Sequence, residues 1–328
     1  MPHTNEFENE VAAAGQLLAL ARDEIARAVV GQRELVDCLF IGLLTNSHVL
    51  LEGVPGLAKT TTVKALASVI DAKFHRVQFT PDLLPSDVVG TLVYNARTAE
   101  YSTRFGPIFC NVLLADEINR AAPKVQSALL EAMQEQQVTI GEKSYALPDP
   151  FLVLATENPI EHEGTYPLPE AQMDRFMLKV DIDYPSPEEE RQIMDYIADE
   201  GAKPRLDPIL TVEQALCLRE TTKRITLADA LKNYIVRLVT ATRDAGSADA
   251  ALAPLIRYGA SPRASINLAK ASRAKALLDG RAYVIPEDIK AVAPAILCHR
   301  ILVTYEAEAE EVTTPHIVGR LLECVPVP

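Results

Sequence analysis

A glycine-rich segment constrains the possible folds of this chain more than any other feature of its sequence. It runs from Gly53 to Thr60 as Gly-Val-Pro-Gly-Leu-Ala-Lys-Thr, between the apolar run 48–51 and the amphipathic stretch 61–70. A glycine-rich turn that leaves a strand and opens a helix directs backbone N–H groups and the positive end of the helix toward one point, which suits a phosphate group. The pattern predicts an α/β domain with a phosphate-binding loop.

Two side chains of this loop indicate a nucleotide bound with magnesium. Lys59 is placed to neutralise the β and γ phosphate oxygens, and Thr60 is placed to ligate Mg²⁺. Ala58 stands where such loops usually have a glycine, which is tolerable if this residue has helical dihedral angles. A glycine-rich turn without a ligand is the alternative for the loop taken alone. The predicted nucleotide-binding residues of the loop are Gly53, Val54, Pro55, Gly56, Leu57, Ala58, Lys59, Thr60 and Thr61.

Polar residues follow two other apolar runs. Asp116 and Glu117 end the run 112–115, and Asn158 follows the run 151–155. Such strand ends meet at the carboxyl edge of an open α/β sheet, where ligands bind. We therefore expect Asp116 to hold Mg²⁺, Glu117 to polarise the attacking water, and Asn158 to hydrogen-bond that water or the γ-phosphate. Taken singly, solvated carboxylates and an ordinary Asn-Pro turn remain alternatives.

The order of apolar runs predicts two domains. Short strand-like runs at 48–51, 74–79, 112–115, 151–155 and 177–182 alternate with helical periodicity, as in a doubly wound parallel sheet. From Tyr184 onward such runs disappear, and Ser186-Pro187-Glu188-Glu189 resembles a helix N-terminus. We expect an α/β nucleotide-binding core over residues 1–184 and an all-helical domain over 185–328. Its predicted helices are 188–200, 211–221, 227–245, 262–278, 286–299 and 313–324.

Composition excludes several other classes of protein. The net charge of −13 opposes a phosphate-binding nucleic-acid surface and favours a protein partner. The histidines and cysteines lack HExxH or CxxC spacing, so a zinc or covalent enzyme is disfavoured. His162 is the one histidine flanked by carboxylates, and we expect it to be a polar loop residue. The sequence indicates buried, reduced cysteines, no leader and no apolar run long enough to span a membrane, so we expect a cytoplasmic protein without membrane insertion.

These motifs, in this order, resemble the AAA+ superfamily, and three longer segments resemble its MoxR family. The segments are 80–87, 115–121 and 163–172, and the resemblance spans nearly the whole chain. It implies an AAA+ P-loop core, with a five-stranded parallel sheet between helices, followed by a small all-helical lid domain. It also implies a Mg²⁺-dependent ATPase with ATP as cofactor, commonly assembled as a homo-hexamer.

The resemblance implies further site residues. Arg175, in Met-Asp-Arg-Phe, resembles the arginine finger that one subunit supplies in trans to its neighbour's site. Arg263, in Gly-Ala-Ser-Pro-Arg, resembles the sensor-2 arginine at the start of a lid helix, with Ser261 as cap and Pro262 in the first turn. Without the resemblance, a structural or solvated arginine is the favoured interpretation of both.

Three weaker similarities concern the adenine side and two hairpins. Val30, Gly31 and Gln32 are similar to the family's segment beside the adenine base. Residues 91–104 resemble the hairpin that interrupts the second helix in the related magnesium-chelatase and MCM-like branch. A second hairpin is predicted over 138–147, turning at Gly141-Glu142. Both are candidates for a pore or partner surface, although surface hairpins often have no special task.

The resemblance implies an ATP-driven chaperone that remodels or assembles a protein partner, such as a von Willebrand A domain protein, or that promotes metal-cofactor insertion. Two alternatives stay open. A nucleic-acid motor of the MCM-like branch would need a basic, aromatic-lined pore, which the acidic composition disfavours. A nucleotide-dependent scaffold with weak hydrolysis is disfavoured by the presence of Glu117, Asn158 and Arg175.

Overall fold

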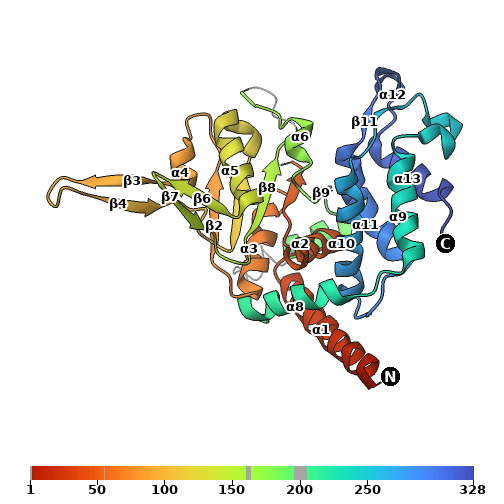
Figure 1. Cartoon of the computed structure of the whole chain (residues 1–328), viewed down its shortest axis with the longest axis horizontal. Helices are drawn as coiled ribbons and strands as arrows, with labels where there is room; N and C mark the ends of the chain where they lie inside the picture. Colours follow the sequence, from red (N-terminus) through yellow and green to blue (C-terminus); the bar gives the residue numbers. More distant parts are fainter. Residues whose placement is uncertain (1, 55, 160–163, 196–204) are drawn as a thin grey trace. The chain divides into compact units, whose positions relative to one another are not determined.

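The computed structural model describes residues 2–54, 56–159, 164–195 and 205–328, which pack as two compact units (Figure 1). The sheet unit contains Leu20–Arg175 and Val180–Leu216. The helical unit contains Met1–Ala19, Phe176–Lys179 and Cys217–Pro328. The helical unit is made of three separate stretches of chain. No single position in the sequence therefore divides the two units. The division into residues 1–184 and 185–328 therefore stays a prediction.

The described residues contain a five-stranded sheet with the strand order β2-β5-β8-β1-β9. Its strands are β1 (Val49–Glu52), β2 (Phe74–Gln78), β5 (Val112–Asp116), β8 (Leu152–Glu157) and β9 (Leu178–Asp181). The pairs β2–β5, β5–β8 and β1–β8 are parallel, and β5 is buried along its whole length. Burial on both faces explains why the central strands β1, β5 and β8 are nearly continuous apolar runs, whereas the edge strands β2 and β9 carry polar residues. All five predicted strands are confirmed, with ends shifted by about two residues at most.

Helices flank this sheet, and one of them begins with the predicted cap. Ser186 Oγ accepts a hydrogen bond from Glu189 N (3.3 Å), and the Glu189 carboxylate accepts one from Ser186 N (2.8 Å). This reciprocal pair satisfies two N–H groups at the start of α7. The helices are α2 (Arg33–Thr45), α3 (Lys59–Val69), α4 (Pro85–Val89), α5 (Pro123–Glu135), α6 (Glu170–Met173) and α7 (Pro187–Met194). The end of the helix predicted over 188–200 lies outside the described residues.

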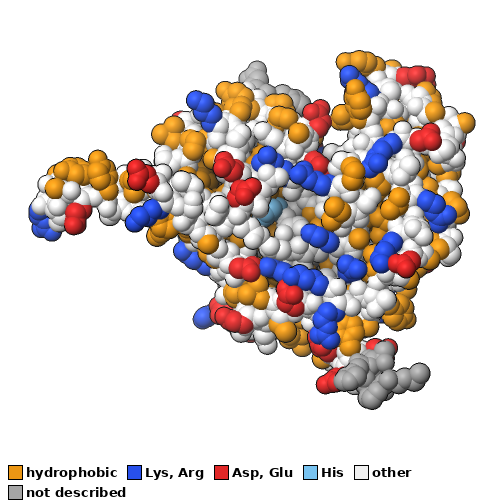
Figure 2. All heavy atoms as spheres, viewed as in Figure 1, with side chains coloured by type: hydrophobic (Ala, Val, Ile, Leu, Met, Phe, Trp, Pro, Cys, Tyr) orange, Lys and Arg blue, Asp and Glu red, His pale blue; other side chains and the backbone are white. Residues whose placement is uncertain are grey.

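Both predicted hairpins are present. The strands β3 (Gly90–Asn95) and β4 (Glu100–Phe105) project from the sheet unit, and β6 (Gln137–Ile140) pairs with β7 (Lys143–Ala146) (Figure 1). The Tyr145 hydroxyl lies 2.9 Å from Thr103 Oγ1, so the two hairpins contact each other. Exposed apolar side chains gather on the projecting hairpin, with Tyr101 70% exposed (Figure 2).

The helical unit consists mostly of helices, as predicted for a lid. Its helices are α9 (Asp229–Ala241), α10 (Pro262–Leu278), α11 (Pro286–Leu297), α12 (Tyr305–Ala309) and α13 (Thr314–Cys324), while α1 (Pro2–Ala26) and α8 (Val212–Arg224) belong partly to each unit. A correction is needed, because β10 (Ile256–Tyr258) pairs antiparallel with β11 (Leu302–Val303). Strands this short carry no periodic signal in the sequence, so neither was predicted.

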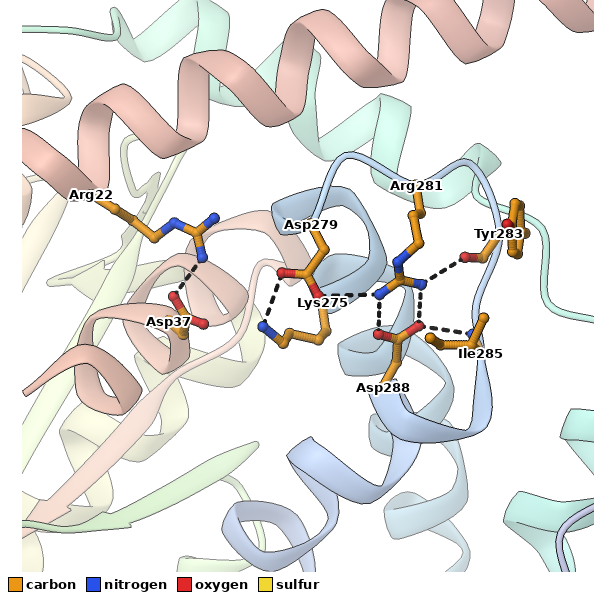
Figure 3. Close-up of polar contacts among 8 residues, drawn as sticks. All are labelled: Arg22, Asp37, Lys275, Asp279, Arg281, Tyr283, Ile285 and Asp288. Carbon is orange, nitrogen blue, oxygen red and sulfur yellow. Dashed lines mark hydrogen bonds and ion pairs between the residues drawn. The ribbon is translucent and has the colours of Figure 1, made fainter.

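A polar network closes the turn between α10 and α11 (Figure 3). The Arg281 Nη1 atom donates to Asp288 Oδ2 (2.8 Å), which also accepts from Ile285 N (2.8 Å) at the start of α11. Asp279 accepts from Lys275 and from Arg281 at 3.1 Å each. Asp288 is 2% exposed, so its charge is matched by these donors as a buried carboxylate requires.

The thiols only partly follow the sequence expectation. Cys38 and Cys110 are buried, and burial raises the pKa of Cys110 to about 12. Cys217 is exposed, so the expectation of buried cysteines is wrong for that residue. Within the described ranges, no helix combines the length and the apolar character needed to cross a bilayer.

Ala58 differs from expectation in its backbone. Its φ of 57° and ψ of 13° are left-handed, so the assumption of helical dihedral angles is wrong. The residue is the N-cap of α3, where the chain turns from the loop into the helix. The left-handed conformation is about 1–2 kcal/mol less favourable than the right-handed one for an L-residue with a Cβ.

We predict that Ala58→Gly raises the free energy of unfolding by about 1 kcal/mol, because glycine adopts positive φ without a Cβ clash. Ala67→Gly, inside α3, is the matched control and should lower it by at least about 0.5–1 kcal/mol. Urea denaturation of both variants measures the two changes. Equal destabilisation by both substitutions would contradict strain at Ala58.

Candidate functional site

The backbone of the glycine-rich segment has the predicted strand–loop–helix geometry. Gly53 directly follows β1, and a Cβ there would lie 2.8 Å from the Ile182 carbonyl oxygen, so only glycine fits. Gly56 has a φ of 92°, which favours glycine. The helix α3 begins at Lys59, and the N–H groups of its first turn lack intrahelical acceptors. Of the predicted loop residues, Pro55 lies outside the described ranges.

A pocket of about 330 Å³ lies over this loop. Its described lining residues are Gly56, Ala58, Lys59, Thr60, Thr61, Arg76, Asp116, Glu117, Thr156 and Asn158. The loop, the end of β5 and the residue after β8 therefore face one space, as the parallel sheet predicted. Gly53, Val54 and Leu57 are not among the described lining residues.

Lys59 lies across the loop. Its Nζ atom donates a hydrogen bond to the Gly53 carbonyl oxygen. Burial lowers the pKa of Lys59, while the carboxylates of Asp116, Glu117 and Glu52 oppose that shift. The ammonium group is thus half-buried among negative charges, next to the backbone that would surround a phosphate.

Asp116 is held from two sides. Its Oδ1 atom accepts from Thr156 Oγ1 (2.6 Å), and its Oδ2 atom accepts from Arg76 Nε (2.9 Å) and Nη2 (2.6 Å). The residue is 8% exposed. Charge-assisted bonds of this length orient a carboxylate strongly.

Glu117 is held by a different set of partners. Its backbone is left-handed (φ 56°), and its N–H donates to Thr156 Oγ1 (2.8 Å). Its Oε2 atom accepts from Gln78 Nε2 (2.6 Å) and from Arg120 Nη1 (2.9 Å). A left-handed non-glycine residue at a strand end changes the direction of its side chain at some energetic cost, a feature common at functional sites.

Four residues of this arrangement were not predicted as site residues from the sequence: Arg76, Gln78, Arg120 and Thr156. Arg76 and Gln78 share one face of β2, and β2 pairs with β5 so that Gln78 lies opposite Asp116. Their spacing of two, which places them on one face of a strand, is a signal that was available for both. The strand that lies beside Arg76 and Gln78 depends on the order of strands in the sheet, and the sequence alone did not show that order.

Of the other predicted catalytic residues, only Asn158 lines the pocket over the phosphate loop, and Arg175 and Arg263 are not among its described lining residues. Asn158 is 5% exposed and lines the pocket. Arg175 is partly buried and is not among the described lining residues. Arg263 is exposed in the first turn of α10, in the helical unit. Ser261 is the N-cap residue of α10 and Pro262 is in its first turn, as predicted, although the Ser261 side chain makes no capping hydrogen bond within the described structure.

The predicted adenine-side segment forms a tight turn. Gly31 and Gln32 have φ values of 67° and 53°, and a Cβ on Gly31 would collide with the Glu189 carboxylate. Neither these residues nor Val30 are among the described lining residues of the phosphate-loop pocket. Their contact with the adenine base therefore stays a prediction, as does the loop role of His162, which lies outside the described residues.

Two family models match the chain. Residues 48–178 match the ATPase family associated with various cellular activities, and residues 248–321 match the AAA lid domain. The first match contains the phosphate loop, both carboxylates, Asn158 and Arg175, and the second contains Arg263.

Related proteins extend these matches over nearly the whole chain. The Chaperone MoxR1 of Mycobacterium tuberculosis is 48% identical over 97% of this chain and 84% of its own length. The Protein MoxR of Methylorubrum extorquens is 32% identical, with 93% of each chain covered. A crystal structure of a protein assigned as an ATPase, from Cytophaga hutchinsonii, is 46% identical, covers 100% of both chains and superposes with a TM-score of 0.93. The chain belongs to the MoxR family of AAA+ ATPases and hydrolyses ATP.

Proposed function

We propose that this chain hydrolyses Mg²⁺-ATP at sites shared between copies of itself and uses ATP to remodel or assemble a protein client. One observation carries the chemical part of the proposal. Asp116 and Glu117 are each fixed by separate hydrogen bonds and face the same pocket as Lys59 and Thr60. This arrangement suits phosphoryl transfer to water, which depends on positioning and electrostatic stabilisation.

Each residue has a distinct role in the proposed reaction. Lys59 and the N–H groups of the loop bind the β and γ phosphates. Glu117 accepts a hydrogen bond from the attacking water and polarises it. Asn158, which is buried at the pocket, orients that water or the γ-phosphate.

The residues present fit a magnesium ion. Thr60 and Asp116 offer hydroxyl and carboxylate oxygens, which Mg²⁺ prefers, and both line the pocket. No group of three or more His, Cys, Asp or Glu able to hold a metal occurs among the described residues. The remaining ligands would therefore be nucleotide phosphates and water, as is usual for this ion. The ion would supply charge neutralisation at the phosphates, and Arg76 orients Asp116 through two hydrogen bonds.

Arginines complete the proposed site. We propose that Arg175 acts in trans on the nucleotide of a neighbouring copy, in a homo-hexameric ring as the family resemblance implies. Its place outside the described lining of its own phosphate-loop pocket supports this arrangement. Arg263 would act on the phosphates as the sensor arginine of the helical unit.

The client is proposed to be a protein. The name of the Mycobacterium tuberculosis relative describes it as a chaperone, and the net charge of −13 opposes nucleic-acid binding. We propose that the client is a von Willebrand A domain protein or a protein that receives a metal cofactor. The proposal places this activity in the cytoplasm.

We predict that Lys59→Ala abolishes nucleotide binding, whereas Glu117→Gln keeps binding and lowers turnover by about 10²–10⁴-fold, because only Glu117 acts in the chemical step. Glu131→Gln, on the exposed face of α5, is the matched control and should hydrolyse ATP normally. Fluorescent-nucleotide titration and phosphate release separate the two effects. Normal turnover by Glu117→Gln would overturn its role.

We predict that Arg175→Ala lowers ATP hydrolysis by about 10³–10⁵-fold, and that mixing it with Lys59→Ala subunits restores activity, because each variant supplies what the other lacks. Arg191→Ala, at an exposed arginine of α7, should retain activity without mixing. Phosphate release across mixing ratios is the measurement. Absence of restored activity at every ratio would count against a shared site.

A further inference from the structure

The residues that follow Arg175 are bound by the short helix η5 (Cys298–Arg300) of the helical unit. The guanidinium of Arg300 donates from Nη2 to the Phe176 carbonyl oxygen (2.6 Å) and from Nη1 to the Met177 carbonyl oxygen (3.1 Å). Its Nη1 atom also donates to the Ile296 carbonyl oxygen, near the end of α11. One side chain therefore joins the backbone of two distant segments.

These contacts are buried. Arg300 is 8% exposed, and Phe176 and Met177 are 0% and 2% exposed. Arginine stays protonated in proteins, and these carbonyl oxygens accept hydrogen bonds from its buried guanidinium. Without it, the buried carbonyl oxygens would lose a partner, which costs about 1–3 kcal/mol each.

His299 reinforces the same attachment. Its Nε2 atom lies 3.3 Å from the Phe176 carbonyl oxygen, and burial holds the pKa of His299 well below its usual value. The ring is therefore neutral, with its proton on Nε2 if it donates to that oxygen. Its buried Nδ1 atom has no hydrogen-bond partner among the described residues.

The attachment lies next to the proposed arginine finger. Residues Phe176–Lys179 pack with the helical unit, whereas the stretch that ends at Arg175 packs with the sheet unit. The backbone from which the Arg175 side chain leaves is thus one peptide bond away from a point fixed by Arg300. An arginine that must reach a phosphate on another copy needs such fixing, since a misplacement of about 1 Å can lower a rate by about 10²-fold.

We propose that Arg300 is a positioning residue for Arg175: by binding the Phe176 and Met177 carbonyls, it sets the place from which Arg175 reaches the nucleotide of the neighbouring copy. This inference rests on the shared site proposed above. A purely structural role for Arg300 is the competing explanation. Arg281 provides the comparison, because it is an arginine of the same unit whose bonds go to Asp279, Asp288 and the Tyr283 carbonyl.

The test uses subunits that can only donate an arginine. Arg175→Ala subunits serve as acceptors, with an intact phosphate loop. The donors carry Lys59→Ala alone, or Lys59→Ala combined with Arg300→Gln, Arg300→Lys or Arg281→Gln. Phosphate release is measured at saturating ATP and a fixed mixing ratio. Thermal unfolding and co-sedimentation confirm that each donor is folded and joins the acceptor.

We expect the Arg300→Gln donor to restore at least about 10-fold less activity per incorporated subunit than the Lys59→Ala donor. The Arg300→Lys donor, which keeps the charge but not the fork of donors, should lie between them, and it decides the question if the glutamine donor does not fold. The Arg281→Gln donor should restore full activity. Full restoration by folded Arg300 donors would overturn the role of Arg300 alone. No restoration by the Lys59→Ala donor would overturn the shared site, and the role of Arg300 with it.

Discussion

The hydroxyl group of Thr156 is the contact on which the geometry of the site depends. It donates to Asp116 Oδ1 and accepts from Glu117 N, so one buried atom of β8 fixes both carboxylate residues at the end of β5. The parallel pairing of β5 with β8 brings it there, with Ala115 opposite Ala155. On its other edge β8 pairs in parallel with β1, with Leu51 opposite Thr156. The phosphate loop that follows β1 therefore lines the same pocket as these carboxylates.

The two carboxylates are bound by different neighbouring side chains. Arg76 binds Asp116 and orients its carboxylate, which in the proposed mechanism suits this group to a cation beside the phosphates. Gln78 and Arg120 bind Glu117 through one oxygen, Oε2. A base that must polarise water benefits from being held before the nucleotide arrives, because no reorganisation is then needed in the chemical step. In the proposed mechanism, the site is therefore preorganised around the γ-phosphate.

Much of the fold was predictable because parallel strands buried on both faces are short apolar runs, and the phosphate loop lies between one such run and a helix. The carboxylates and Asn158 were predictable for the same reason, since each follows a run. The roles of Arg76 and Gln78 were not, because β2 is adjacent to β5 in space but not in sequence. Ala58 was misjudged, because its left-handed backbone arises from the way the loop enters α3.

The central claim is that the nucleotide site is completed by an arginine of a second copy, so activity must depend on assembly. The most direct measurement is ATP hydrolysis per subunit across a wide range of protein concentration, with sedimentation velocity in the presence of Mg²⁺-ATP on the same samples. If the site is shared, specific activity rises steeply with protein concentration and follows the assembled fraction. Constant specific activity from a sedimenting monomer would contradict it.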